Sequence, residues 1–151
     1  MLNIKILCVG RLKEKFYIEA AREYEKRLGA FCKIDVEEVA EAKPAVSLER
    51  EAESLEAKIP PSAYVIALCI EGQETDSESF AKILKHCAVS GMSKLCFIIG
   101  GSTGLHERIK TRADRRLSMS RMTFPHHLAR VMLLEQIYRG FQINEGGKYH
   151  K

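Results

Sequence analysis

The chain lacks several features that would place it in large classes of proteins. Its 151 residues contain no apolar run of about 18 residues, the minimum for a membrane-spanning helix. The apolar N-terminus is short, includes Lys5 and has no small-residue cleavage site, so we interpret it as a first strand rather than a secretion signal. Internal repeats and linkers are also missing. We therefore expect one domain over residues 1–151 and no membrane partner.

The cysteines form no Cys-x-x-Cys pair and show no spacing typical of metal ligands. An odd number of cysteines without a secretion signal indicates a reducing compartment, so we expect a cytoplasmic protein. Most of these cysteines lie in or beside apolar runs, where a free thiol packs like a small hydrophobic side chain. We predict no metal site.

Three familiar site patterns are absent as well. The glycine-rich segment 100–104 does not match the Gly-x-Gly-x-x-Gly fingerprint of dinucleotide-binding folds, which disfavours a dinucleotide-dependent oxidoreductase. No Gly-Lys-Ser/Thr follows this segment, so it is not a phosphate-binding P-loop. No Ser/His/Asp or Cys/His triad can be placed.

Charge is unevenly distributed along the chain. The formal net charge is +4, to which residues 1–100 contribute −2 and residues 101–151 contribute +6. Basic residues therefore gather in the segment that also holds the glycines at 100–104. This asymmetry fits an ordinary solvated surface, and it equally fits an electrostatic surface for nucleic acid.

Strand and helix patterns alternate along the chain. Strands are predicted at residues 4–9, 32–39, 64–70, 95–99 and 117–119. Helices are predicted at residues 14–28, 48–59, 78–88, 105–113 and 125–143, with Ser77 as the N-cap of the third and a mobile surface loop at 41–47. This order predicts an α/β fold with a mainly parallel sheet and helices on both faces.

Two loops are candidates for ligand binding. Ligands of open α/β sheets bind outside the carboxyl ends of the strands, where the loop 100–104 is expected. Its paired glycines carry no Cβ, so another molecule can approach the backbone closely. The loop 118–124 leads into the last helix at Pro125, and His126 and His127 open that helix, whose N-terminus attracts anions. Together they suggest a nucleotide-like ligand beside a phosphate-rich one.

The last helix has an apolar arc wider than a surface helix needs, which predicts a second buried face, most simply against another copy of the chain. Glu135 and Arg139 lie on its narrow polar face and can pair four residues apart. Arg130 falls inside the apolar arc, where a guanidinium needs a partner. Either it extends to the edge of the arc, or it holds an anionic ligand.

Several segments together resemble the RlmH family of SPOUT-class methyltransferases, which methylate a pseudouridine of 23S ribosomal RNA at N3. The likeness spans the whole chain, and the segments that carry it are 9–15, 23–28, 97–105, 118–126, 134–139 and 149–151. The resemblance implies a C-terminal trefoil knot, S-adenosylmethionine bound within the knot, and a homodimer.

The resemblance also implies site residues. The implied cofactor-binding residues are Leu68, Gly100, Met119, Ser120, Arg121, Met122, Thr123 and Phe124. His126 and Arg130 are implied to bind substrate, and Arg130, Tyr149 and His150 are implied to be catalytic. The sequence departs from the family at Lys148, where a proline or another small residue is frequent.

The implied reaction is transfer of the sulfonium methyl to a base nitrogen of large-subunit ribosomal RNA, free or in the assembled ribosome. A cation such as Arg130 would favour the anionic form of that nitrogen, and His150 is a candidate proton acceptor because imidazole titrates near neutral pH. The alternative function is a non-enzymatic, ribosome-associated RNA-binding module, which the basic charge and glycine loops also fit. No DNA partner is expected.

Overall fold

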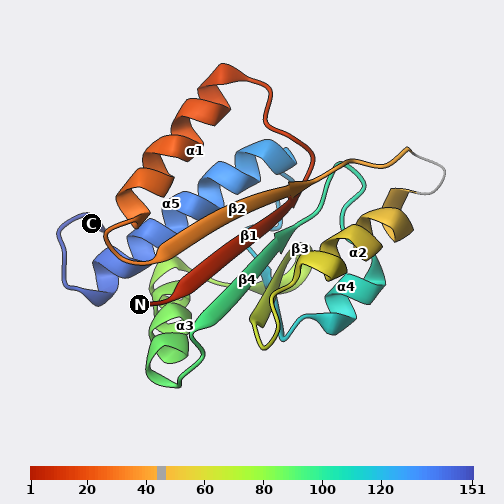
Figure 1. The fold of residues 1–151 in the computed structure, drawn as a ribbon. Coiled ribbons are helices and arrows are strands. Elements are labelled where there is room, and N and C mark those ends of the chain that lie inside the picture. Colours follow the sequence, from red (N-terminus) through yellow and green to blue (C-terminus); the bar gives the residue numbers. More distant parts are fainter. Residues whose placement is uncertain (44–46) are drawn as a thin grey trace.

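The computed structural model describes residues 1–43 and 47–151 and shows an α/β architecture (Figure 1). Its strands are β1 (Asn3–Val9), β2 (Lys33–Val39), β3 (Tyr64–Glu74), β4 (Lys94–Ile99) and β5 (Arg115–Ser118). Its helices are α1 (Lys15–Leu28), α2 (Ser47–Lys58), α3 (Ser77–Val89), α4 (Glu107–Arg112) and α5 (His126–Asn144). Each predicted strand and helix is present, and β3 runs on beyond its predicted end. Part of the predicted mobile loop, residues 44–46, lies outside the described residues.

The strands form one sheet in the order β2-β1-β4-β3-β5, and every pair is parallel. In the centre of the sheet, Ile6 of β1 pairs with Val36 on one side and with Phe97 on the other. From Leu95 to Ile99, β4 is buried throughout, as expected for a strand covered on both faces. The prediction of a mainly parallel sheet is confirmed.

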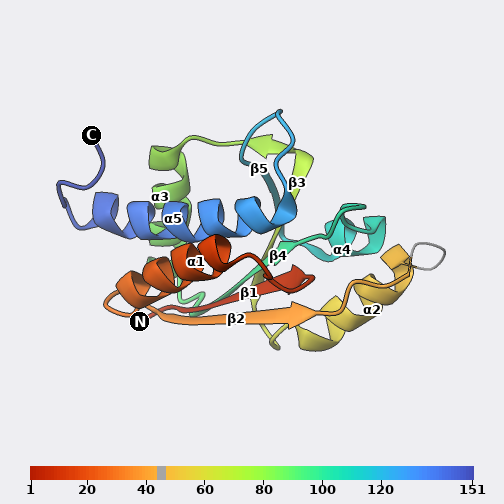
Figure 2. The same ribbon diagram turned by 90° about the horizontal axis from the view of Figure 1, so that it is seen from above.

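Helices cover both faces of the sheet. The helices α1, α3 and α5 lie on one face, whereas α2 and α4 lie on the other (Figures 1 and 2). Because side chains alternate along a strand, Ile6 packs into the first layer and Leu7 into the second. The last helix, α5, packs against both α1 and α3 (Figure 2). The predicted two-sided arrangement is confirmed, whereas the trefoil knot stays a prediction from the family resemblance.

The ladder between β3 and β5 is interrupted. Leu117 of β5 pairs first with Leu68 and then with Gln73, so the intervening residues of β3 bulge out of the ladder. Gly72 lies in this bulge, where a Cβ would come within 2.7 Å of the carbonyl carbon of Leu117. A bulge bends its strand and re-aims side chains. Here it turns residues 69–71 toward the carboxyl end of the sheet.

The N-cap of α3 differs from the prediction. Asp76, not Ser77, caps the helix, and its carboxylate accepts a hydrogen bond of 2.7 Å from the backbone N–H of Ser79. This bond keeps the pKa of Asp76 below its usual range. Ser77 is the first helical residue instead, and its hydroxyl donates to Gln136 of α5 at 2.7 Å. Of the helices that the structure describes, none combines the length and the apolar character needed to cross a bilayer.

Gly72→Ala is expected to lower the free energy of unfolding by about 1–3 kcal/mol, because the new methyl group overlaps the backbone of β5. Chemical denaturation measures this change. Gln73→Ala, on the neighbouring exposed position of β3, is the control and should change stability by less than about 0.5 kcal/mol. Equal stability of the Gly72 and Gln73 variants would contradict the steric role of this glycine.

Candidate functional site: a pocket at the carboxyl end of the sheet

A pocket of about 670 Å³ opens where β4 and β5 end, beside the bulge of β3. Its walls come from three segments, 68–71, 99–105 and 117–126, with Lys110 of α4 and Ala129 of α5 at its margin. Most of the lining is apolar, and a few hydroxyl, backbone and charged groups are set into it. This composition and size are typical of small-molecule sites. The location matches the sequence-based expectation for a ligand at the carboxyl ends of parallel strands.

Gly100 and Gly101 shape one wall of the pocket. A Cβ on Gly100 would overlap the carbonyl oxygen of Gly104, and a Cβ on Gly101 would lie 2.9 Å from Cγ1 of Val9. The loop closes on itself through a 3.0 Å bond from the N–H of Gly104 to the carbonyl oxygen of Gly101. The paired glycines are thus required by the turn itself. Because these glycines have no side chains, they also leave the backbone of the loop accessible from the pocket.

The opposite wall is the loop from Met119 to Phe124. Ser118 donates to the carbonyl oxygen of Ser120 at 2.8 Å, and the hydroxyl of Ser120 accepts from the N–H of Met122 at 3.0 Å. These local bonds hold the loop, while the side chain of Met122 stays 71% exposed at the pocket.

The predicted cofactor-binding residues gather around this pocket, with one exception. Those that line it are Leu68, Gly100, Met119, Ser120, Met122, Thr123 and Phe124. The exception is Arg121, whose side chain is 87% exposed and lies 3.7 Å from Glu74 of β3. Arg121 lies at a bend of the loop, and its guanidinium is directed toward Glu74 instead of the pocket.

Polar groups of the pocket are partly neutralised within the chain. Lys110 forms an ion pair with Glu71, and this hydrogen bond lowers the pKa of Glu71. Burial raises the pKa of the neighbouring Cys69 thiol. The pocket therefore presents a neutral thiol and a compensated ion pair, so it offers no unbalanced charge at this side to a ligand.

His126 lines the pocket at the start of α5. Its Nε2 atom is buried and has no hydrogen-bond partner among the residues that the structure describes. Burial lowers the pKa of His126, with a further lowering from His127 and Arg130 that Glu41 partly offsets. The imidazole is therefore neutral near pH 7, and its unpartnered Nε2 is buried near Gly10.

Arg130 does not line the pocket. Its side chain is 4% exposed, and its guanidinium donates to Oε2 of Glu38 at 2.6 Å and to the carbonyl oxygen of Gly10 at 2.9 Å. The same Glu38 oxygen accepts from the N–H of Leu12 at 3.2 Å. The sequence left two explanations for Arg130, extension to the edge of the arc or an anionic ligand. The structure gives a third, because the partner is a carboxylate of the same chain, 92 residues away.

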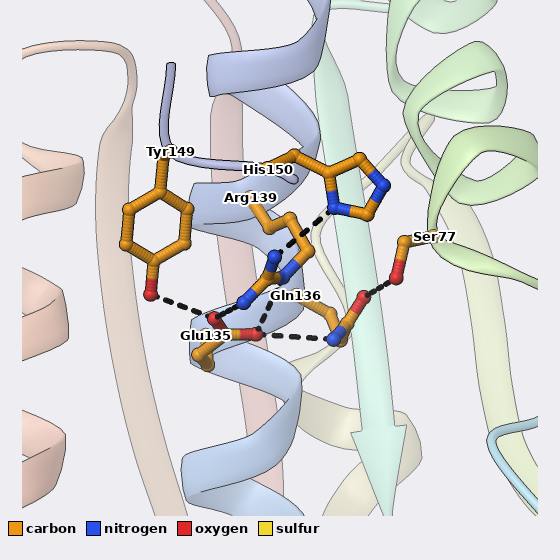
Figure 3. A network of polar contacts seen from close by, with 6 residues as sticks. All are labelled: Ser77, Glu135, Gln136, Arg139, Tyr149 and His150. Atoms are coloured by element: carbon orange, nitrogen blue, oxygen red, sulfur yellow. Dashed lines mark hydrogen bonds and ion pairs between the residues drawn. The ribbon is translucent and has the colours of Figure 1, made fainter. Parts of the chain in front are cut away.

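Tyr149 and His150 belong to the C-terminal tail, which packs against the second half of α5 (Figure 3). Tyr149 donates to Glu135 at 2.8 Å, and His150 contacts Arg139 at 3.0 Å and Glu78 of α3 at 3.2 Å. Glu135 and Arg139 form the predicted pair, with an N–O distance of 2.6 Å. Burial raises the pKa of Glu135, but hydrogen bonds from Arg139 and Tyr149 outweigh it, and the pKa lies below its usual range.

The structure therefore does not bring Tyr149 and His150 to the pocket of their own chain. Arg139, which holds His150, follows His126 by thirteen helical positions, a rise of about 20 Å along α5. From the sequence, Glu135 and Arg139 are predicted as a pair, not as site residues. Their position in the segment 134–139, which carries the family resemblance, was the available signal.

Comparison with known proteins assigns the chain to a family. Residues 2–150 match the family described as "Predicted SPOUT methyltransferase". The chain belongs to the SPOUT methyltransferases. It is 46% identical to the ribosomal RNA large subunit methyltransferase H of Bacillus pumilus, over 99% of this chain and 100% of that protein. The family resemblance found in the sequence is thereby confirmed.

Solved structures agree with the fold of this SPOUT methyltransferase. A methylase family protein from Haemophilus influenzae superposes with a TM-score of 0.58 at 14% identity, over 99% of this chain and 71% of that one. The SpoU methyltransferase AviRb from Streptomyces viridochromogenes, in complex with the cofactor AdoMet, gives 0.50 at 14% identity, over 97% and 59%. In the described part of the chain, no group of three His, Cys, Asp or Glu residues is placed to hold a metal ion.

Glu38→Ala is expected to destabilise the protein more than Arg130→Met does. Removing Glu38 leaves a buried guanidinium with only the Gly10 carbonyl, which costs about 3–5 kcal/mol. Arg130→Met removes the charge, keeps an apolar stem in an apolar layer, and leaves Glu38 one-third exposed to water, so it should cost at least about 1 kcal/mol less. Chemical denaturation measures the free energy of unfolding of both variants, and Glu53→Ala, at an exposed position, is the control. Equal losses of stability, or a larger loss in Arg130→Met, would contradict this account.

Stability is expected to fall as the pH drops below about 6.5, because His126 has a lowered pKa in the fold. The unfolded chain then binds more protons at this position than the folded one, and protonation favours unfolding. The stability that neutral His126 contributes is fully present above the pKa of this histidine in the unfolded chain, and it is lost as the pH falls toward the lower pKa of the folded state. Denaturation from pH 8 to pH 5.5 should show a smaller loss in His126→Gln than in the wild type; identical slopes would contradict the lowered pKa.

Proposed function

We propose that this SPOUT methyltransferase transfers a methyl group from S-adenosylmethionine to N3 of a pseudouridine in the 23S ribosomal RNA of the large subunit. The observation that carries the proposal is the pocket between the glycine turn 100–104 and the loop 119–124. The name of the relative from Bacillus pumilus supports ribosomal RNA as substrate. The cofactor in the complex from Streptomyces viridochromogenes supports S-adenosylmethionine as methyl donor.

The residues of the pocket fit the cofactor. Leu68, Ile99 and Leu117 provide an apolar wall for a flat heteroaromatic ring. The bare backbone at Gly100 and Gly101 lets main-chain groups approach the ring edge without an intervening Cβ. When bound, S-adenosylmethionine supplies a methyl group already activated by its sulfonium. The protein therefore contributes mainly binding and alignment of the two reactants.

The proposed site residues divide between two copies of the chain. His126 is proposed to contact the substrate base through the part of its neutral imidazole that lines the pocket. Tyr149 and His150 are proposed to act from the second copy, with His150 of the partner subunit accepting the proton of the imide nitrogen. Arg130 is proposed to be a positioning residue that does not touch the substrate, since its guanidinium is already bound to Glu38 and to the carbonyl of Gly10.

A homodimer is proposed because α5 keeps partly exposed apolar residues after packing on α1 and α3. These include Val131, Tyr138 and Phe141, which form a band along the helix. In a two-fold pair with antiparallel α5 helices, the end of one helix lies beside the start of the other. The tail that docks on Arg139 would then reach the pocket of the second copy.

The protein is also proposed to act in the cytoplasm. All five cysteines are free thiols. Burial raises the pKa of Cys8 and of Cys96 to about 12, so these thiols stay protonated and unreactive in a reducing environment.

Calorimetry with S-adenosylmethionine separates this function from the alternative, a non-enzymatic RNA-binding module. The wild type should bind one molecule per chain and transfer labelled methyl to large ribosomal subunits. Gly100→Ala should lose binding at least about tenfold because the loop deforms. The control Gly147→Ala overlaps the flexible side chain of Gln142, meets its backbone oxygen only at 3.3 Å, and should bind normally. Absence of cofactor binding in the folded wild type would favour the RNA-binding module.

Mixing two inactive variants tests the shared site. Gly100→Ala lacks a working pocket and His150→Ala lacks the tail imidazole, but a mixed dimer contains one pocket and one tail that are both intact. Remixing the two should restore roughly a quarter of wild-type methyl transfer, since half of the dimers are mixed and each has one working site. No recovery, or a monomeric mass at micromolar concentration, would contradict the proposal.

A further inference from the structure

A large aromatic side chain is exposed beside the pocket. Phe16, in the first turn of α1, is 64% exposed, although it belongs to the residue types most often buried. The helices α1 and α5 lie side by side on the same face of the sheet and start at the same end of it (Figure 2). Phe16 is therefore placed near the start of α5, where His126 and His127 lie.

Four rings connect this exposed position with the pocket. The rings of Phe16 and Tyr17 are 4.4 Å apart between centroids, those of Tyr17 and His127 are 6.2 Å apart, and those of His127 and His126 are 4.1 Å apart. His126 lines the pocket. We call Phe16, Tyr17, His127 and His126 the aromatic track. It runs from solvent to the wall of the pocket.

Cations flank the outer end of the aromatic track. Arg11 and Lys13, in the loop from β1 to α1, are exposed and have no ion-pair partner among the described residues. Lys15 lies 3.9 Å from Glu19, with both side chains mostly exposed, a geometry that contributes little pairing energy. Glu14 is the other exposed acid of this segment, so the three cations outnumber the two acids. The net charge of the segment 11–19 is therefore positive.

We propose that the aromatic track is a docking surface for unpaired RNA bases next to the target nucleotide. Single-stranded RNA is bound by aromatic faces on which bases stack and by cations that contact the phosphates. Here Phe16 offers the outermost face, and Arg11 and Lys13 lie where a backbone would follow. The inference rests on the proposed function, and adds to it the surface that leads the RNA to the pocket.

Charge favours RNA over a second copy as the occupant. If the tail of a second copy lay on the aromatic track itself, its Lys148 and Lys151 would meet Arg11 and Lys13 as like charges. Phosphates complement the same cations. Contact of a second copy with Phe16 remains one possible result of the test described below.

The test is binding of the full-length protein to purified large ribosomal subunits. Phe16→Ala should weaken binding about 5- to 150-fold, the usual effect of removing one stacking ring, and Phe16→Trp should bind as the wild type does. Phe16→Leu separates stacking from apolar contact, because it keeps apolar bulk without a π face, and should fail as Phe16→Ala does. Val89→Ala, 74% exposed at the end of α3, is the matched control and should bind normally.

Salt dependence tests the cations. Lys13→Ala should reduce the slope of log affinity against log salt by about one, the loss of one phosphate contact. Lys94→Ala, exposed at the opposite end of the sheet where β4 begins, should leave the slope unchanged. Equal slopes for the two variants would overturn the role of Lys13 as a phosphate contact.

Three results would overturn the proposal: no binding of the wild type to the subunits, unchanged binding of Phe16→Ala, or full binding of Phe16→Leu. A lower molecular mass of Phe16→Ala in solution would overturn it too, since Phe16 would then be buried between copies. Calorimetry with S-adenosylmethionine keeps this inference separate from the proposed function. Loss of subunit binding with intact cofactor binding supports the track, whereas absent cofactor binding in the wild type counts only against the enzyme.

Discussion

The buried guanidinium of Arg130 connects the segments beside the pocket, at the carboxyl end of the sheet. It joins three segments that are distant in sequence: the start of α5, the end of β2 through Glu38, and the residue after β1 through the carbonyl of Gly10. Glu38 in turn accepts from Leu12, so the loop after β1 is fixed against α5. A charge enclosed to this degree needs its partners, and their positions are therefore constrained. His126 lies close to this junction, since a Cβ on Gly10 would lie 3.4 Å from its Nε2.

Steric exclusion shapes the rest of the pocket. The bulge in β3 turns residues 69–71 toward the cavity, and it exists because Gly72 lets the backbones of β3 and β5 come together. The turn at Gly100 closes for the same reason, with Gly104 in the space that a side chain would need. Both features therefore depend on close backbone contacts at positions that lack a Cβ atom. Such a cavity is largely formed before any ligand enters it.

The two ends of α5 carry different parts of the proposed site. His126 opens the helix at the pocket, while Tyr149 and His150 dock near its far end on Glu135 and Arg139 (Figure 3). A rigid helix keeps these groups apart within one chain, which makes a second copy the simplest way to unite them. The aromatic track starts on α1 and reaches the same end of α5 as the pocket. The two surfaces would place RNA and partner tail on either side of one cavity.

The sequence by itself determined the elements, the parallel sheet and the position of the pocket, because periodicity, buried runs and glycines after a strand act over a few residues. It also indicated Glu135 and Arg139 as a pair, since they lie one helical turn apart. Only the tertiary structure decided that Glu38 is the partner of Arg130, that Arg121 points away from the pocket, and that Tyr149 lies far from His126. Each of these depends on how segments tens of residues apart pack together, and the burial and pairing that result leave no local pattern in the chain.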